Sequence, residues 1–439
     1  MAEPRPASPL SAETTVGRIG ADGDGVAVLP SGETVYLPLT LPGERVLPHA
    51  LSRRGEGWSG EADILDPSPE RQPAPCPHFG ACGGCTLQHW QDAPYAAWKS
   101  AQLTAALERA GYDAPAVGPM ARTLPGQRRR VDLALLRVDG GVRVGLHRHR
   151  GTDVVDLQTC LVLEPALVGL IGVLRRVLPG VAGLRRVGSA VVNRLDSGID
   201  ILLRTDGPLV VTDRAKLTAM AAEVGACRVS WALGPGLPEP ACTLGPIQTN
   251  VAGVAVSPPP GAFLQASASG AAAITAAVLA GLPGKLVSKA RFVELFAGCG
   301  TLTFALAEHA RTIAYEGDAP SYEALRRAVA GRRVEAVLRD LARQPLSAKE
   351  LTGAAAIILD PPYAGAAAQM AGIAASGVER VIYVSCNPGA LARDGRVLHG
   401  AGYRLLTATP VDQFVWSSQV ESVCVFEHGR PSRTGPRRS

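Results

Sequence analysis

Short apolar runs alternate with helix-forming stretches along residues 261–428, and most of the apolar runs end at a glycine or a carboxylate. Unbroken apolar runs of this length are typical of strands buried on both faces of a parallel sheet. Their alternation with helices predicts βα units and therefore a doubly wound, Rossmann-like α/β sheet. We expect strands at 291–296, 312–316, 334–338 and 382–385, a further strand that ends at 359, and helices at 267–280 and 302–309.

The earlier part of the chain has other patterns. Residues 14–66 contain short alternating runs broken by glycine and proline, which predict a small β-barrel. Strand-like runs at 131–135, 193–204 and 209–212 predict a central α+β region, and the prolines before Gly261 mark its end. The predicted organisation is a disordered leader (1–12), the barrel (13–67), a cysteine-rich loop and helix (68–119), the central α+β domain (120–260), the α/β domain (261–428) and a disordered basic tail (429–439).

Composition narrows the class of protein. The chain has 439 residues, too many for one hydrophobic core, and with 46% hydrophobic and 19% charged residues it is a globular chain. No apolar run reaches the roughly 18 residues of a membrane helix, and the N-terminus lacks a signal-peptide pattern. We therefore expect no membrane partner, and we expect a cytoplasmic monomer.

Arginines are concentrated in one stretch of the predicted central domain. Their density between residues 121 and 150, against two Asp, suits contacts to RNA phosphates, although no aromatic side chains lie among them to stack bases. A solvated, arginine-rich sheet face explains the pattern equally well. The eight residues are Arg122, Arg128, Arg129, Arg130, Arg137, Arg143, Arg148 and Arg150.

Three of the nine cysteines lie close together. Cys76, Cys82 and Cys85 follow one another at spacings of five and two intervening residues, in a glycine-containing loop that can turn three thiolates toward one centre. This pattern predicts a metal or cluster site, with Cys160 as the fourth ligand. Zinc and an iron–sulfur cluster both accept four thiolates, so the spacing leaves both open. We interpret His78 and His89 as ordinary loop or surface residues.

Polar groups follow successive strands of the α/β domain. Ligands bind at the carboxyl edge of such a sheet, so the thiol at residue 386 and the carboxylate at residue 360 are candidates for catalysis or ligand binding there. The alternative is that Cys386 is a small residue packed in a turn. Glycines after the first strand allow close approach of a ligand, and carboxylates after the next two strands suit the hydroxyls of a nucleoside-type cofactor. The series is Gly298, Gly300, Glu316, Asp340, Asp360 and Cys386.

These motifs resemble a known family. The βα order is similar to that of the class I S-adenosylmethionine methyltransferases, and the run at 383–388 resembles the RNA uracil-5-methyltransferases in particular. Larger members of that family also carry an N-terminal TRAM barrel and a four-cysteine [4Fe-4S] site with the spacing seen here. The resemblance implies S-adenosylmethionine and an iron–sulfur cluster as cofactors. It also implies an RNA partner bound in part by the central domain, with ribosomal RNA favoured and transfer RNA as the alternative.

The resemblance also assigns roles to individual residues. It implies that Cys386 is the nucleophile and Glu421 the base, and that the cluster ligands are Cys76, Cys82, Cys85 and Cys160. The residues implied to hold the cofactor or the target base are Gln265, Phe296, Gly298, Thr301, Glu316, Asp340 and Asp360.

Three positions depart from the family's usual residues. Ser267 stands where Asn is usual, Tyr363 follows the proline pair where Arg is common, and Gln419 replaces a His two residues before the base. An adenine amino-group methyltransferase remains an alternative, because residues 360–363 (Asp-Pro-Pro-Tyr) also match that family's pattern. A non-catalytic iron–sulfur protein that binds RNA is a third hypothesis.

Overall fold

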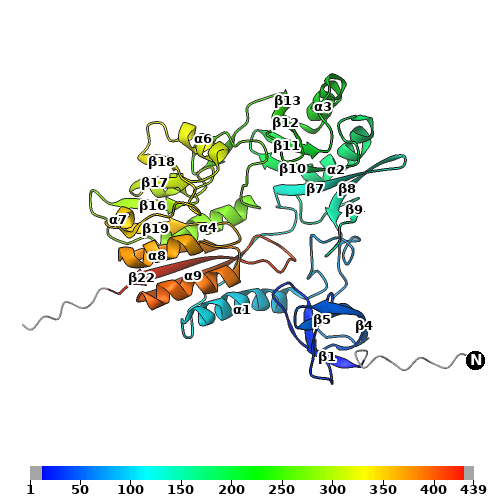
Figure 1. Cartoon of the computed structure of the whole chain (residues 1–439), viewed down its shortest axis with the longest axis horizontal. Helices are drawn as coiled ribbons and strands as arrows, with labels where there is room; N and C mark the ends of the chain where they lie inside the picture. The colour runs from blue at the N-terminus through cyan, green and yellow to red at the C-terminus, as the bar shows by residue number, and fades with distance from the viewer. Residues whose placement is uncertain (1–11, 430–439) are drawn as a thin grey trace, which may run out of the picture. The chain divides into compact units, whose positions relative to one another are not determined.

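The computed structural model describes residues 12–429, which divide into two compact units (Figure 1). The first unit contains the chain up to Lys99 together with Leu146–Leu157 and Phe414–Gln419. The second contains Ser100–Gly145, Gln158–Gln413 and the chain from Val420 onward. Apart from their innermost residues, 12 and 429, the predicted leader and basic tail lie outside the described residues.

The first unit contains the predicted barrel, which is confirmed as a closed five-stranded structure. Alternate side chains of its strands point inward, and Val16, Val35 and Val46 are almost completely buried there. Around the barrel the strand order is β1 (Thr14–Ile19), β2 (Gly25–Val28), β3 (Thr34–Leu37), β5 (Gly57–Asp66) and β4 (Arg45–Arg54).

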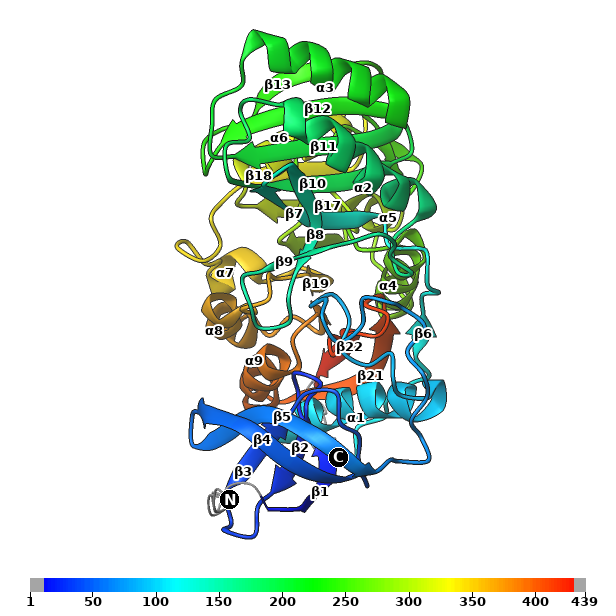
Figure 2. The same cartoon turned by 90° about the vertical axis from the view of Figure 1, so that its right-hand side faces the viewer.

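The central region forms a seven-stranded sheet, labelled in Figure 2 together with its helices. Helix α3 (Val211–Val224) packs against β12 and β13 and also against α2 (Pro165–Val177), which is followed by a 3₁₀ turn, η1 (Leu178–Gly180). The strand order is β13 (Glu239–Thr243), β12 (Ala226–Leu233), β11 (Gly198–Thr205), β10 (Val187–Leu195), β7 (Arg130–Val138), β8 (Gly141–His147) and β9 (Val154–Asp156). A two-stranded ribbon, β14 (Thr249–Val251) with β15 (Val254–Val256), follows.

One predicted strand of this region is wrong. Residues 209–212 do not form a strand, because α3 begins at Val211. Val211 is 84% exposed, so the short apolar run that suggested a strand faces solvent instead of a sheet core. A four-residue run carries too little periodicity to distinguish a strand from the first turn of a helix.

The C-terminal sheet has eight strands and is the predicted doubly wound α/β sheet. Its strand order is β18 (Val334–Leu338), β17 (Arg311–Glu316), β16 (Arg291–Leu295), β19 (Ala356–Leu359), β20 (Arg380–Ser385), β22 (Glu421–His428), β21 (Tyr403–Asp412) and β6 (Ala121–Arg122). The first five strands are parallel, and β22 runs antiparallel between β20 and β21. The short edge strand β6 comes from the predicted central domain and pairs with β21.

Each face of this sheet has its own hydrophobic core. On one face Leu359 and Tyr383 pack with Leu103 of α1 (Asp92–Ala110) and with residues of α8 (Ala367–Ser376) and α9 (Pro388–Gly400). On the other face Ile358 and Ile382 pack with α4 (Ala268–Ala280) and with the helical turn that contains Leu306. The remaining helices of the α/β domain are α5 (Thr303–Ala307), α6 (Ala319–Ala328) and α7 (Ala348–Leu351).

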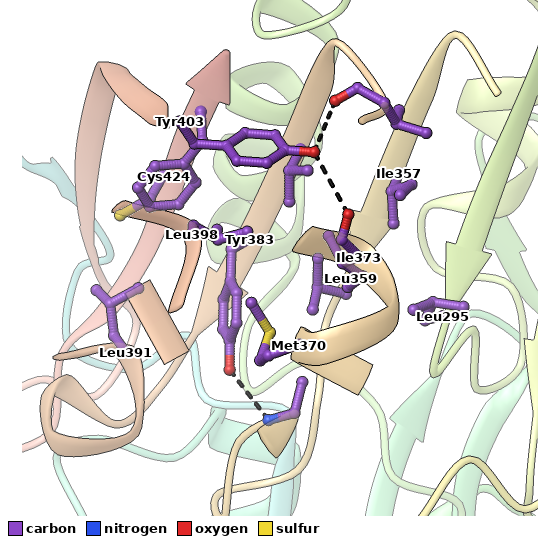
Figure 3. Packing of buried hydrophobic residues seen from close by; sticks show 14 of the residues in the cluster. Leu295, Ile357, Leu359, Met370, Ile373, Tyr383, Leu391, Leu398, Tyr403 and Cys424 are labelled. Atoms are coloured by element: carbon purple, nitrogen blue, oxygen red, sulfur yellow. Dashed lines mark hydrogen bonds between the residues drawn. The ribbon is translucent and has the colours of Figure 1, made fainter. Parts of the chain in front are cut away.

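Two buried tyrosines link the first of these cores to polar groups (Figure 3). The Tyr383 hydroxyl donates to the Asp394 carboxylate at 2.7 Å, and the same carboxylate accepts the Ala366 N–H at 2.7 Å. The Tyr403 hydroxyl instead donates to the Val378 carbonyl at 2.8 Å. Asp394 therefore ties β20, α9 and the loop before α8 together beneath the carboxyl edge of the sheet.

We expect Tyr383→Phe to lower the free energy of unfolding by about 1–3 kcal/mol, because it removes a donor from a buried carboxylate. Tyr403→Phe is the matched control, and its loss should be smaller because only neutral carbonyls lose a donor. Urea denaturation of both variants measures the difference. A larger loss for Tyr403→Phe would contradict this assignment.

Candidate active site

Cys386 lies at the carboxyl end of β20, immediately before α9. Asn387 caps that helix, since its side-chain oxygen accepts the Gly389 N–H at 2.9 Å while its amide donates to the Tyr363 carbonyl at the same distance. The cysteine is half-buried. The capped turn therefore holds a partly accessible thiol at the edge where α/β sheets bind their ligands.

The register of β22 brings Glu421 to this thiol. Ser385 and Ser422 are paired residues of β20 and β22, so the next pair toward the edge is Cys386 with Glu421. The Ser422 hydroxyl donates to the Ser385 carbonyl at 3.2 Å and reinforces that register. Glu421 is 4% exposed. A thiol and a carboxylate from different segments of the sequence thus meet at one point of the edge.

Asp360 is the third group at this edge and follows β19. It is connected to Glu421 by two glutamine side chains. Gln265 Nε2 donates to Asp360 Oδ2 at 3.0 Å, and Gln265 Oε1 accepts from Gln413 Nε2 at 2.9 Å. Gln413 Nε2 also donates to Glu421 Oε2 at 2.9 Å. The four side chains form one hydrogen-bonded chain, and Gln413 is the member that the sequence analysis missed.

Burial and mutual repulsion shift the pKa values of these groups upward. Desolvation raises the pKa of Glu421, and the nearby Asp360 carboxylate raises it further, whereas the hydrogen bond from Gln413 lowers it. Desolvation likewise raises the pKa of Asp360, against the hydrogen bond from Gln265. Burial and the charges of Glu421 and Asp360 raise the pKa of the Cys386 thiol to about 12. In the substrate-free site the cysteine is therefore a neutral thiol at neutral pH.

The turn after β16 has the backbone of a ligand-binding loop. Phe296 has φ 64°, which is uncommon for a bulky residue, and Gly298 and Gly300 also have positive φ. A Cβ on Gly300 would lie 2.6 Å from the Phe304 ring, whereas a Cβ on Gly298 would meet open space. The Gly298 N–H donates to Glu316 Oε2 at 2.6 Å, so β17 holds this turn through its terminal carboxylate.

Two other predicted cofactor residues lie nearby. Thr301 is in the same turn, just before α5. Asp340 follows β18 and accepts the backbone N–H groups of Ala342 and Arg343 at 3.0 and 3.1 Å. A Cβ on Gly317 would lie 3.4 Å from the Asp340 Cα, so the loops after β17 and β18 are close neighbours. The series of acids predicted along the edge is therefore gathered there.

Glu294 is a buried carboxyl that the sequence analysis did not single out. It lies inside β16, is 2% exposed, and its Oε2 has no hydrogen-bond partner among the described residues. Desolvation is the main cause that raises its pKa, with smaller contributions from Asp360 and Glu316. The signal in the sequence was an acid inside an otherwise apolar strand, which is rare without a functional reason.

The arginine-rich stretch divides into structural and exposed residues. Arg129 donates to the Gln265 carbonyl at 3.1 Å, and Arg137 donates to four carbonyls, including that of Leu184 at 2.8 Å. Arg150 donates to Asp24. Arg143 and Arg148 are exposed. Several guanidinium groups thus hold the protein's own chain, a role that neither interpretation of the sequence included, and both interpretations stay open for the exposed Arg143 and Arg148.

The cysteine-rich loop belongs to the first unit. Cys76, Cys82 and Cys85 are partly buried, as is Cys160 in the second unit, and Cys82 Sγ accepts the Gly84 N–H at 3.4 Å. Among residues 12–429, no three His, Cys, Asp or Glu side chains are arranged as a metal site. His89 is 3% exposed and so is no surface residue, and burial lowers its pKa to about 4.

None of the helices within residues 12–429 combines the length and hydropathy of a membrane-spanning segment.

The fold and the edge residues define the class of protein. The crystal structure of Pyrococcus abyssi tRNA (uracil-54, C5)-methyltransferase in complex with S-adenosyl-L-homocysteine has a TM-score of 0.73 and 20% sequence identity, and covers 94% of this chain and 99% of that one. The fold is that of a class I methyltransferase.

The sequence comparisons show the family. A family model described as tRNA (Uracil-5-)-methyltransferase matches residues 339–428, the segment that holds Asp360, Cys386 and Glu421. An uncharacterised RNA methyltransferase of Brucella suis is 39% identical over 434 residues, which covers 96% of this chain and 99% of that protein. The 23S rRNA (uracil(1939)-C(5))-methyltransferase of Pectobacterium atrosepticum is 32% identical over 428 residues, covering 94% and 93%. The chain belongs to the S-adenosylmethionine-dependent RNA uracil-5-methyltransferases.

We expect Glu316→Gln to weaken S-adenosylhomocysteine binding at least about tenfold, because a carboxamide cannot replace both acceptor oxygens that hold the turn. Those oxygens accept the N–H groups of Gly298 and Asp318. Isothermal titration calorimetry measures the change. The control is Glu323→Gln on α6, which removes a carboxylate that pairs with Arg326 of the same helix. This variant should bind the ligand as the wild type does. Equal affinities for both variants would remove Glu316 from the cofactor site.

Proposed function

We propose that the protein transfers a methyl group from S-adenosylmethionine to C5 of a uridine in 23S ribosomal RNA, through a covalent bond between Cys386 and C6 of the base. Glu421 then removes the C5 proton. The observation that carries this proposal is the pairing register of β20 and β22, whose last pair is Ser385 with Ser422, so that Cys386 and Glu421 are the next residues toward the edge. The charge of Glu421 is also one of the causes that raise the pKa of Cys386. An RNA substrate also makes the cytoplasm the expected location.

The chemistry of uracil explains the need for a thiol. C5 of uracil is too weak a nucleophile to take a methyl group directly. When the Cys386 sulfur bonds to C6, the thiol proton passes to solvent water and the electron pair of the C5–C6 double bond moves toward O4, which gives an enolate. C5 then attacks the methyl group of the sulfonium, and S-adenosylhomocysteine leaves. The high pKa of Cys386 implies that the proton departs as the sulfur attacks.

The second half of the reaction needs a base. After methyl transfer C5 still carries its proton, and this proton must leave before the ring can regain its double bond and expel the sulfur from C6. Glu421 is the carboxylate beside the thiol, and the Gln413 amide donates to its Oε2. The proton therefore passes from C5 to Glu421, and Cys386 is released for the next cycle.

The position of the site constrains the RNA. Cys386 is half-buried and Glu421 almost fully buried, so a base stacked in a duplex cannot reach them. The target uridine should lie in a loop or be flipped out of its stack. The relative from Pectobacterium is named for 23S rRNA, whereas the family model and the Pyrococcus structure are named for tRNA. We favour ribosomal RNA because the ribosomal relative aligns over nearly the whole chain at the higher identity.

Adenine amino-group methylation is the rival reaction. Tyr363, which follows Asp360 and two prolines, is 59% exposed, and in that reaction an aromatic at this position would stack on the flipped base. A rival enzyme of this kind has no need of a thiol. Cys386 therefore separates the two reactions.

We expect Cys386→Ala and Glu421→Gln to fail at different steps on unmodified 23S ribosomal RNA transcripts. Cys386→Ala should form no covalent complex and no 5-methyluridine, because C5 never gains enolate character. Glu421→Gln should still transfer the methyl group and should accumulate the methylated adduct, because only the proton acceptor is lost. Denaturing gels detect the adduct, and mass spectrometry of RNA digests identifies the product.

Transcripts that contain 5-fluorouridine serve as the control, since fluorine replaces the proton and wild-type enzyme should then be trapped as well. Methylated adenine from Cys386→Ala would favour the rival reaction. Turnover of Glu421→Gln at the wild-type rate would exclude Glu421 as the base. A parallel set of tRNA transcripts tests the choice of substrate.

We also propose that Cys76, Cys82, Cys85 and Cys160 hold a [4Fe-4S] cluster. The support is the spacing of the first three thiols and the N–H donor on Cys82 Sγ, a contact typical of cluster thiolates. Four thiolate ligands leave no open position on the cluster, so its role would be structural.

We expect protein purified without oxygen to be brown and to contain about four iron atoms per chain. Cys82→Ser and Cys160→Ser should both lose the colour and the iron. Cys242→Ser, which changes a similarly half-buried cysteine on β13, should keep both. Elemental analysis and visible absorption measure the result, and stoichiometric zinc without iron would overturn the assignment.

A further inference from the structure

Gln413 lies between the carboxyl groups of Asp360 and Glu421, in the series of hydrogen bonds that connects them. It follows β21, is 2% exposed, and its Nε2 makes two hydrogen bonds of 2.9 Å, to Gln265 Oε1 and to Glu421 Oε2. Both N–H groups of its amide are thereby used. Its Oε1 is buried without a hydrogen-bond partner among the described residues. A buried, unpaired carbonyl is costly, so the two acceptors must impose the orientation of this amide.

Asp360 sets the orientation of both glutamine amides in this series of hydrogen bonds. A carboxylate can only accept, so Gln265 must turn its amide nitrogen toward Asp360 and its oxygen toward Gln413. That oxygen in turn demands an N–H from Gln413. With one N–H engaged there, the other points at Glu421. Reversing either amide would set an oxygen against a carboxylate oxygen, so the two glutamines are oriented together.

We propose that Gln413 is the positioning residue of the base: its amide, oriented by Asp360 through Gln265, holds the Glu421 carboxylate in place and in its ionised form. The inference rests on the proposed function, since it concerns the step that Glu421 performs. Gln413 touches neither the thiol nor the transferred group in this scheme, and it acts through Glu421 alone.

The direction of the effect follows from the charges around Glu421. Asp360 after β19, Cys386 after β20 and Asp412 at the end of β21 are the titratable groups beside it, and Glu294 of β16 is a further acid near Asp360. The guanidinium group of Arg129 donates a hydrogen bond to the backbone carbonyl of Gln265, so it lies beside this series of hydrogen-bonded side chains. Repulsion and burial thus favour protonated Glu421, and the Gln413 N–H opposes them.

The packing around Gln413 supplies a second way to disturb it. A Cβ on Gly270, in the first turn of α4, would lie 2.7 Å from the Gln413 Cβ and 2.9 Å from its Oε1. The same Cβ would lie 2.8 Å from Ser267 Oγ, which caps α4. Gly270→Ala would therefore displace the Gln413 side chain, together with that cap, without changing the chemistry of the amide. Gln369 offers a matched control, because it is a similarly buried glutamine (1% exposed) whose Oε1 accepts the Leu346 N–H at 3.1 Å and whose amide donates to the Leu341 carbonyl.

The test follows the decay of the methylated protein–RNA adduct across neutral pH in single turnovers, with full-length protein and unmodified 23S ribosomal RNA transcripts. Glu421 works as a base only above its pKa. Loss of the Gln413 N–H should raise that pKa and so shift the acid limb of the pH profile of the decay rate to higher pH. We expect a shift of about one pH unit for Gln413→Met. Gly270→Ala should shift the limb in the same direction, whereas Gln369→Met should leave it in place even if the protein is less stable.

Transcripts that contain 5-fluorouridine report on the earlier steps. Gln413→Met should still form that adduct, because no proton is removed, and its formation also shows that the variant is folded. A wild-type acid limb in Gln413→Met would overturn the inference. Failure of the variant to form the fluorinated adduct would also overturn it, if urea denaturation shows that the variant is folded, since Gln413 would then act before Glu421. If the wild-type enzyme itself gives no adduct and no 5-methyluridine with rRNA or tRNA transcripts, the proposed function is wrong, and this inference, which rests on it, is wrong as well.

Discussion

The antiparallel pairing of β22 between β20 and β21 is the constraint on which the site depends. In a purely parallel sheet each strand contributes one residue at its carboxyl end, whereas an antiparallel neighbour brings the start of its own segment to the same edge. Glu421 is the first residue of β22 and lies beside Cys386 for this reason. A slip of one residue would turn Glu421 to the other face of the sheet. The two hydrophobic cores, one on each face, oppose that slip because it would move residues such as Val423 and Phe426 out of the core in which each is packed and into the core of the other face.

Carboxyl groups dominate the electrostatics of this edge. Glu294, Asp360 and Glu421 all have raised pKa values, with burial as the main cause in each case. Such a site is costly for anions and is suited to a cation, and the cofactor of this family carries its positive charge on the sulfonium. The amides of Gln265 and Gln413 moderate the repulsion by donating to the two carboxylates that flank the thiol.

The turn after β16 begins with a strained residue. Phe296 has a positive φ, and two glycines in the left-handed region follow within four residues. A strained turn persists only where neighbouring contacts hold it, and here Glu316 accepts the Gly298 N–H while Ala297 donates to the Tyr315 carbonyl at 3.0 Å. The loop is therefore shaped by β17 before any ligand arrives.

The local pattern of the sequence was sufficient to predict the βα order, the barrel and the acids at the ends of β17 and β19, because hydrophobic periodicity and glycine placement are properties of a few neighbouring residues. It failed at residues 209–212, where a short exposed run carried too little signal, and it did not predict that Ala121 and Arg122 form an edge strand of the C-terminal sheet.

Glu421 was recognised only through the family resemblance, and Gln413 was not recognised at all, since nothing in its immediate sequence marks it. Its partners Gln265 and Glu421 lie 148 and 8 residues away along the chain. Strand order, register and the orientation of buried amides depend on contacts between distant segments. The sequence by itself thus determined which groups stand at the ends of strands, and only the tertiary structure decided which of them touch.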